Sequence, residues 1–427
     1  MQAVAPGSVT PPVIIGDANR LASDLTPVLP QFREHQADLD GMNDRASWHP
    51  RASLCALMLP LLASGPAMAW QDAGLEQKLA RAARLVTDGD FGQADAVYRD
   101  VLRRDSESEE AIKGLQAIAQ ARPLPSRSGR FDEVRSLLPT TFKCFESEHF
   151  IALSGADAQW TRQQLESLES AFVAFGDYAD DLELDAWPLA HKLVCVFFAS
   201  RREYADFGLT YDRRRVESSF GYYSLPRDRT VLFSSPDEDD FDEFGTRRLI
   251  AAVVHEAIHH LHYHTGVQSR FIQYPLWATE GLATVFETNL PSGPMGPDED
   301  FAPRRRRFER LVEQDRILPL SSLVRFDSTI GLAREQVAAI YNQSYALMRW
   351  LMHTDPDGVR TYLAMMRREP PGRPTSDRHL EIFEAAFGDV RSLDVAWLRH
   401  ELATIEYEIV AESLRERLAS ATTDGGE

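Results

Sequence analysis

The chain has 427 residues and a formal net charge of −19 at pH 7, with 65 acidic residues against 46 basic ones. This length is sufficient for a large hydrophobic core and for more than one domain. The acidic balance argues against nucleic acid and anionic lipid as partners, and it favours solubility or basic ligands.

The first 69 residues divide into two segments. Residues 1–41 are rich in proline, alanine and acidic groups, and we interpret them as an extension upstream of the true start. Residues 42–69 begin with methionine and contain arginines, an apolar run and a small-x-small pattern at Ala67–Ala69, which are typical of a signal peptide cleaved before Trp70. A retained anchor is disfavoured because the run is short and interrupted by proline. We therefore expect a bacterial protein that is secreted or periplasmic and keeps no membrane span after cleavage.

Residues 70–121 are rich in alanine, and their apolar residues recur at helical spacing. The segment resembles one tetratricopeptide repeat and the start of a second. Because one repeat cannot bury its own face, it must lean on the next domain or on a protein partner. A helical hairpin that acts as a brace is the alternative. Residues 122–130 have the composition of a linker.

Residues 131–418 are expected to form the main domain, with a disordered tail at 419–427. Alternation and apolar runs predict the following elements: a strand over 142–153, a helix over 157–180, a buried strand over 192–198, a short helix over 201–207 and a β-hairpin whose turn is at 226–229. The hairpin offers an edge strand that an extended peptide could join. The order of elements predicts an α+β fold, with a small mixed sheet, an active-site helix and a helical C-terminal half.

Two cysteines remain after signal removal, Cys144 and Cys195, and both fall in predicted strands. An oxidising compartment permits a disulfide between them. Two buried thiols are the alternative, and the sequence leaves both open.

The segment His255–His259 has the sequence HEAIH, an HExxH motif within a helix predicted over 246–264. Residues four apart lie on one helix face, so His255 and His259 project together and can hold one zinc ion. Glu256 lies beside them, where it can accept a proton from the water that zinc activates.

A third ligand is expected from a second amphipathic segment, Trp277–Glu287, which reads WATEGLATVFE. Catalytic zinc takes three protein ligands and keeps one position open, and Glu280 completes a His2Glu set. We therefore predict Zn²⁺ bound by His255, His259 and Glu280. Three further histidines near the helix end are expected not to be ligands of this zinc: His260, His262 and His264.

Two charged runs receive structural interpretations. The acidic run over 237–243 is interpreted as a solvated loop because it lacks the ligand spacing of an EF-hand. The basic run Arg304–Arg307 is interpreted as an exposed helix start with salt-bridge partners, and not as a site for polyanions.

The motifs HEAIH and WATEGLATVFE, together with YNQSYAL at Tyr341–Leu347, resemble the gluzincin zinc metallopeptidases. Within that group the resemblance is to secreted bacterial peptidase MA-like families, often catalogued as domains of unknown function, and more distantly to M1 aminopeptidases. It implies that Glu280 is the third zinc ligand, that Glu287 is a carboxylate supporting the ligands, and that Tyr341 stabilises the tetrahedral intermediate. Tyr345 is the rival of Tyr341 in that role.

The chain departs from the M1 pattern in three places. Thr279 replaces an asparagine, and Gln343-Ser344 replaces a Lys-Gly pair. The G-x-M-E-N segment, which captures the free amino terminus of a substrate in M1 enzymes, is missing upstream of His255. Aminopeptidase activity is therefore not implied.

Together these features predict a zinc-dependent hydrolase of the cell envelope, which cleaves peptide or protein substrates with Glu256 as general base. One alternative is a catalytically idle, peptidase-like binding module that recognises a protein partner through its tetratricopeptide-like segment. A second alternative is hydrolysis of a non-peptide amide.

Overall fold

The computed structural model describes most of the chain after residue 64, with side chains from residue 74 onward. The described ranges are 65–121, 124–125, 128–216, 219–234, 248–290 and 293–405. The predicted extension at 1–41, all but the last residues of the predicted signal peptide, the acidic run and the predicted tail lie outside them. The described part combines helices with one small mixed sheet, so the predicted α+β class is confirmed. None of its helices is long and apolar enough to cross a membrane.

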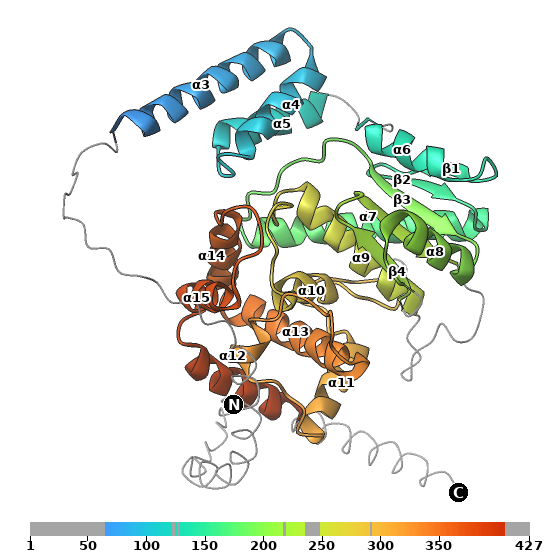
Figure 1. Cartoon of the computed structure of the whole chain (residues 1–427), viewed down its shortest axis with the longest axis vertical. Coiled ribbons are helices and arrows are strands. Elements are labelled where there is room, and N and C mark those ends of the chain that lie inside the picture. The colour runs from blue at the N-terminus through green and yellow to red at the C-terminus, as the bar shows by residue number, and fades with distance from the viewer. Residues whose placement is uncertain are drawn as a thin grey trace, which may run out of the picture. The chain divides into compact units, whose positions relative to one another are not determined.

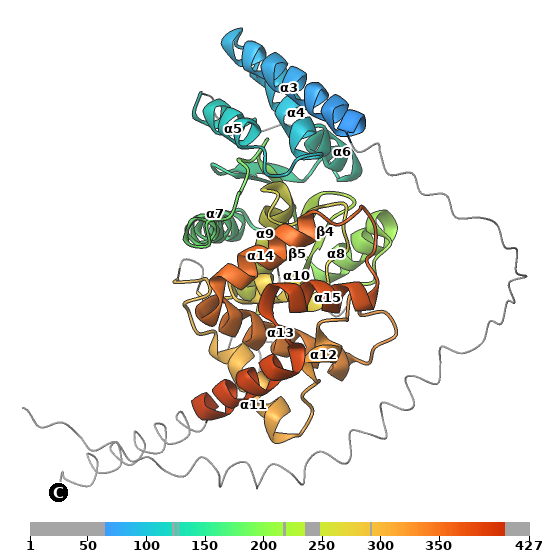
Figure 2. The same cartoon turned by 90° about the vertical axis from the view of Figure 1, so that its left-hand side faces the viewer.

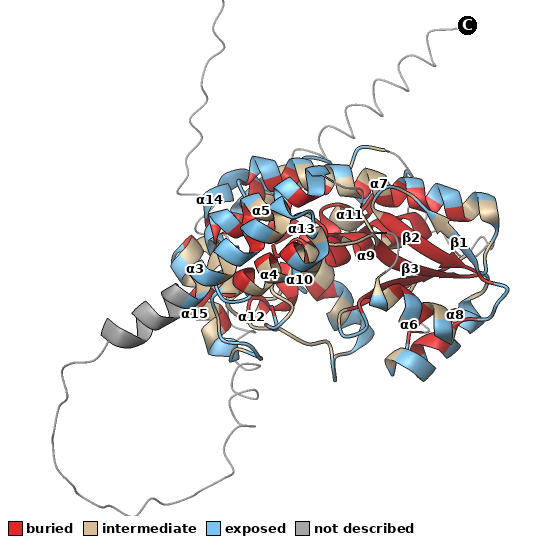
Figure 3. Cartoon of the chain, turned by 90° about the horizontal axis from the view of Figure 1, so that it is seen from above, coloured by how far each residue is buried: buried red, intermediate tan, exposed pale blue. Residues whose placement is uncertain are grey.

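The sheet contains five strands in the order β1-β2-β3-β5-β4. Neighbours β2, β3 and β5 are parallel, whereas the outer strands β1 and β4 run antiparallel to β2 and β5. The strands are β1 (Lys143–Glu146), β2 (Phe150–Ser154), β3 (Leu193–Phe198), β4 (Gly221–Ser224) and β5 (Arg229–Phe233). Central strands covered on both faces are continuously apolar, and β2 and β3 are buried along their whole length (Figure 3).

The prediction of a single strand over 142–153 is wrong. A tight turn divides that segment into β1 and β2, which form an antiparallel hairpin with Cys144 opposite Leu153. The turn is closed by the backbone N–H of Ser147, which donates to Phe150 O at 3.0 Å. Three consecutive polar residues at 147–149 interrupt the alternation and mark this turn.

The two cysteines are not joined by a disulfide. Cys144 is exposed on β1 and Cys195 is buried on β3, and β2 lies between these strands. The alternative of two buried thiols holds for Cys195 but is wrong for Cys144.

Three helices, α3 (Gly65–Thr87), α4 (Phe91–Leu102) and α5 (Glu109–Ala121), precede the sheet. They bury a shared apolar cluster, and Trp187 from the main domain packs against it. The helical prediction is thus confirmed, whereas the resemblance to tetratricopeptide repeats stays a prediction. The predicted linker ends early, because Ser128 caps helix α6 (Gly129–Leu137).

Helix α7 (Ala158–Asp181) begins after its N-cap Asp157, as predicted, and packs against the sheet and α9. Helix α8 (Arg201–Phe207) continues into one π-helical turn, Gly208–Asp212. Helix α9 (Arg248–His264) carries the HExxH motif and contacts β4 on one side and α10 on the other. It therefore runs between the sheet and the C-terminal helices (Figures 1 and 2).

The C-terminal half is helical, as predicted. Its helices are α10 (Leu276–Thr284), α11 (Ala302–Glu313), α12 (Leu320–Leu323), α13 (Arg334–Thr354), α14 (Pro356–Arg367), α15 (Ser376–Phe387) and a last helix over 390–405. Helices α10 and α13 pack closely because α10 has a glycine at the crossing. A Cβ on Gly281 would lie 2.9 Å from Ser344 O, which real side chains do not tolerate. This close packing places Glu280 beside the first turns of α13.

Candidate metal centre

Helix α9 is held in the core by its apolar face, where Val254, Ala257 and Ile258 are completely buried. Because the face is fixed, the two histidines of the motif take one direction. His255 and His259 are each only 7% exposed, and both face α10. Gly266, at φ +75°, ends the helical segment where the sequence predicts its stop.

Three potential ligand atoms converge between α9 and α10. The Nε2 atoms of His255 and His259 are 3.1 Å apart. Glu280 Oε2 lies 3.1 Å from His255 Nε2 and 3.5 Å from His259 Nε2. The structure therefore brings together the three residues that the sequence predicts as ligands.

The size of this triangle fits a tetrahedral zinc ion. Nitrogen and oxygen ligands bind zinc at about 2.0–2.1 Å, so two ligands of a tetrahedron are separated by about 3.3 Å. The three measured separations of 3.1, 3.1 and 3.5 Å bracket that value. Two imidazoles and one carboxylate are also the donor set of a catalytic zinc site with one position left for water or substrate.

Glu287 supports this triangle from behind. Its Oε1 lies 2.9 Å from His255 Nδ1, which orients the ring so that Nε2 faces the other two ligands. Arg304 holds the same carboxylate through Nε at 2.7 Å and Nη2 at 2.6 Å. Glu287 lies beyond the end of α10, so the predicted amphipathic segment is not one continuous helix.

The interpretation of Arg304 as part of an exposed helix start is wrong. Only 17% of its side chain is exposed, and it bonds Glu287 and Asn342 Oδ1. The sequence does not predict the contact of Arg304 with Glu287, because a run of four arginines at a helix start is typical of a solvated surface. The contact depends on the packing of α11 against α13, which places the first arginine inside.

The carboxylates of Glu280 and Glu287 favour a positive charge on His255. Burial lowers the pKa of His255, but hydrogen bonds to Glu280 and Glu287 raise it more, to about 10. Burial raises the pKa of Glu287, but the charge of Arg304 and the bond to His255 bring it down to about 2. The pKa of Glu280 is likewise held well below its ordinary value by His259 and His255. The carboxylates are therefore ionised, as metal ligands require.

Glu256 is next to the triangle but is not part of it. Its Oε2 accepts a hydrogen bond from the backbone N–H of Tyr223 on β4 at 2.6 Å. The close approach of β4 depends on a glycine, since a Cβ on Gly221 would lie 2.4 Å from Leu232 Cδ2 and 3.2 Å from Glu256 Cγ. One carboxylate oxygen is thus held by the sheet edge. No residue pattern predicts this contact, because the donor is a backbone group.

The predicted edge strand is present, since β4 is the last strand of the sheet. Its outward backbone groups at Tyr223 are already bonded, however: the N–H to Glu256 and the carbonyl to Arg214 Nη1 at 2.9 Å. An extended peptide can therefore join β4 only away from Tyr223.

Of the two rival tyrosines on α13, Tyr341 is at the cluster of candidate metal ligands. Its ring centroid is 6.4 Å from that of His255. Burial, the charge of Glu280 and a hydrogen bond to that carboxylate raise its pKa well above the ordinary value. Tyr345 instead bonds the backbone N–H of Phe301 at 2.9 Å and Asp300 at 3.2 Å, away from the cluster.

The candidate ligands line a cavity of about 680 Å³, together with Glu256 and Tyr341. Tyr263, one turn after His259 on α9, also lines this cavity and was not anticipated from the sequence. Burial and the charge of Glu280 raise its pKa to about 12. The helical spacing from His259 is the signal that could have identified it.

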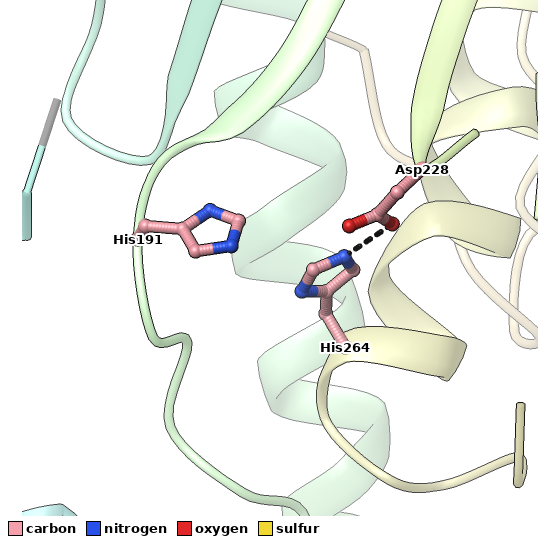
Figure 4. Close-up of side chains that lie close together, drawn as sticks. All are labelled: His191, Asp228 and His264. Atoms are coloured by element: carbon pink, nitrogen blue, oxygen red, sulfur yellow. Dashed lines mark hydrogen bonds and ion pairs between the residues drawn. The ribbon is translucent and has the colours of Figure 1, made fainter. Parts of the chain in front are cut away.

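The other histidines near the helix end are not part of the triangle. His262 faces Phe175 and Tyr178 in the core, and burial lowers its pKa to about 3. His264 lies in a second cluster with His191 and Asp228 (Figure 4). There Asp228 Oδ1 is 2.7 Å from His264 Nε2 and 3.0 Å from Arg270 Nη2. Arg270 therefore forms an ion pair with Asp228 in this cluster.

Comparison with protein families gives one match. Residues 249–372 match the model of a family described as "Protein of unknown function (DUF1570)". No curated protein matches the chain. The matched segment begins at the second residue of α9 and includes His255, Glu256, His259, Glu280 and Tyr341, so the whole cluster falls in the part of the chain that resembles this family.

Proposed function

We propose that this protein is a zinc-dependent hydrolase of the gluzincin type that cleaves peptide bonds. The observation that carries the proposal is the triangle of His255, His259 and Glu280, whose ligand atoms are 3.1–3.5 Å apart. Buried groups with perturbed pKa values that converge on a cavity are a physical indicator of a functional site. A purely structural account leaves Glu256 unexplained, because a carboxylate beside the triangle adds negative charge without ligating.

His255, His259 and Glu280 would hold the zinc. When bound, the metal lowers the pKa of water and polarises the scissile carbonyl. Glu256 accepts the proton of the attacking water and passes it to the departing amine, and the Tyr223 N–H keeps its carboxylate in place. Tyr341 remains protonated at neutral pH because its pKa is raised, so it can donate a hydrogen bond to the oxygen that gains negative charge.

The test combines metal analysis with one conservative substitution. The full-length protein is expected to contain one zinc per chain and to cleave members of a mixed fluorogenic peptide set. Glu256→Gln should retain zinc and lose about 100- to 10,000-fold in kcat, the range attributed to a general base. Glu110→Gln, an exposed change on α5, is the matched control and should leave kcat unchanged.

Three results would contradict the proposal. A chain that binds no zinc after incubation with the metal excludes the metal mechanism. Full activity of Glu256→Gln excludes the general base. Zinc binding without hydrolysis of any peptide, combined with turnover of a non-peptide amide, would assign the same chemistry to another substrate class.

A further inference from the structure

The described lining of the cavity at the candidate metal centre is basic, whereas the whole chain is acidic. The cavity's only acidic lining residues, within the described part of the chain, are Glu256, Glu280 and Glu287, which all belong to the cluster itself. Six arginines line the remaining wall: Arg214, Arg215, Arg248, Arg304, Arg307 and Arg334. The net charge of −19 predicts basic ligands, yet the wall around the cluster is basic.

Four of these arginines have no carboxylate partner in the part of the chain that the structure describes. Arg304 is paired with Glu287, but Arg214, Arg215, Arg248 and Arg334 form no ion pair with a carboxylate among the described residues. In a chain with 65 acidic and 46 basic residues, carboxylates are abundant, so arginines without one are notable where they gather. Their positive charge therefore acts on any ligand that occupies the cavity.

Neutral groups hold two of these guanidinium groups in place. Arg214 donates from Nη1 to Tyr223 O at 2.9 Å and lies over the ring of Tyr222 at 5.3 Å. Arg248 lies over the ring of Phe220 at 5.5 Å. These contacts position the side chains without cancelling their charge. Because Tyr223 also bonds Glu256, Arg214 is held by the residue that orients the proposed base.

Helix periodicity places Arg248 and Arg334 at a defined distance from the cluster. Arg248 precedes His255 by seven residues on α9, and Arg334 precedes Tyr341 by seven residues on α13. Seven residues are two helical turns, so each arginine shares a face with its partner and lies about 10 Å along the axis. About three residues of an extended peptide span that distance.

We propose that the cavity selects acidic peptides, with Asp or Glu side chains within about three residues of the bond at the metal centre. This inference rests on the proposed function for the identity of that bond. The recognition itself requires only that a peptide occupies the cavity. Guanidinium groups suit carboxylates because they form paired, charge-assisted hydrogen bonds.

The experiment separates binding from cleavage. Zinc-loaded Glu256→Gln is titrated with three fluorescent peptides of equal length, acetylated and amidated at their ends, in which Glu, Gln or Lys occupies the flanking positions. Anisotropy should show that the Glu peptide binds at least about tenfold more tightly than the Lys peptide. This difference in affinity should be smaller at high salt. When Arg248→Gln and Arg334→Gln are added to the Glu256→Gln protein, most of this difference in affinity should disappear. Arg360→Gln, an arginine paired with Glu183 outside the cavity, should not change it.

Each outcome decides between the two proposals. Equal affinity for the three peptides, tighter binding of the Lys peptide, no measurable binding of the Glu peptide or a difference in affinity unaffected by the double substitution would overturn the inference. Stronger competition by polyphosphate than by the Glu peptide would assign the arginines to a phosphate ligand and also overturn it. If wild-type protein binds the Glu peptide selectively without cleaving it, the hydrolase proposal fails and the charge preference stands. If all three peptides are cleaved with equal kcat/KM, the inferred preference for acidic peptides fails and the hydrolase proposal stands.

Discussion

At the scale of single residues, the candidate site is a set of potential ligands whose orientation depends on their neighbours. His255 is held from behind by Glu287, and Glu287 is held by two bonds from Arg304. Such partners fix the ring and raise the basicity of the ligand, and their loss commonly reduces metal affinity 10- to 100-fold. Arg304, Glu287 and His255 therefore form one chain of hydrogen bonds that ends at the triangle of candidate ligands.

The first residue-scale prediction concerns this chain. Glu287→Gln should lower zinc affinity by about 10- to 100-fold, because the neutral amide supports the imidazole less well and leaves Arg304 without a charge partner. Competition with a fluorescent zinc chelator measures the effect. Glu309→Gln, a change on α11, serves as the comparison. Unchanged affinity in Glu287→Gln would show that Glu287 has only a packing role.

A second residue-scale prediction separates the tyrosines. Tyr341→Phe should fold and bind zinc normally but lose about 100- to 1,000-fold in kcat, as expected for removal of one oxyanion donor. Tyr345→Phe should keep its kcat because its hydroxyl bonds Phe301 and Asp300. The variant that tests the structure most directly is Tyr263→Phe, since Tyr263 lines the same cavity. If Tyr263→Phe alone loses turnover, the donor is on α9 and the assignment to Tyr341 is wrong.

At the scale of elements, the β4–β5 hairpin contacts α9 at two points, at Glu256 and at His264 in its last turn. Tyr223 N–H bonds Glu256, and its hydroxyl bonds Asp228 in the turn at 3.0 Å. Asp228 in turn contacts His264 in the last turn of α9. Its φ of 54° lies in the left-handed region, which Asp tolerates better than most residues. The turn of the hairpin is thus held against the last turn of α9 by the buried carboxylate of Asp228.

The pH dependence of stability should reveal this carboxylate. Burial raises the pKa of Asp228, but the hydrogen bond from His264 and nearby positive charge lower it more, to below its ordinary value. A pKa that is lower in the folded state contributes stability above the unfolded value of about 3.9, and this contribution is lost as pH falls. Asp228→Asn should therefore destabilise the protein by about 3 kcal/mol at pH 7 and by progressively less as the pH falls below about 4, measured by urea unfolding. A difference independent of pH would show that its charge is not involved.

At the scale of the whole described chain, Trp187 connects the N-terminal helices to the end of α9. Trp187 packs against the cluster of α3, α4 and α5. Its backbone N–H donates to Thr265 O at 2.6 Å, and its ring covers Gly266, where a Cβ would come within 2.5 Å. Arg99 donates to the neighbouring Pro188 O at 2.7 Å. These contacts favour a bracing role for the helical segment.

Trp187→Ala tests that role. Loss of this packing should cost about 2–4 kcal/mol, somewhat less than for a fully buried aromatic, and should lower Tm. Zinc affinity should change little because Trp187 is remote from the triangle. Val173→Ala, at an exposed site on α7, is the control. A Tm equal to that of the wild type would favour a segment that serves a partner and not the fold.

The sequence by itself determined those features that depend on local periodicity. His255 and His259 share a face because α-helix geometry places residues four apart together, whatever the rest of the chain does. The class of fold follows from the order of apolar runs and amphipathic segments, and the helix boundaries of α7 and α8 follow from their capping residues, Asp157 and Ser200.

Only the tertiary structure decided which distant groups complete the site. Tyr223 is 33 residues from Glu256, and Arg304 is 17 residues from Glu287. Arg304 looks like a surface arginine in the sequence but is drawn inside by the packing of α11 on α13. Such contacts depend on how elements pack, and neither a backbone N–H nor an arginine in a basic run carries a local pattern that predicts its partner. Periodicity therefore locates the ligands, whereas packing determines what orients them and the charge of the cavity around them.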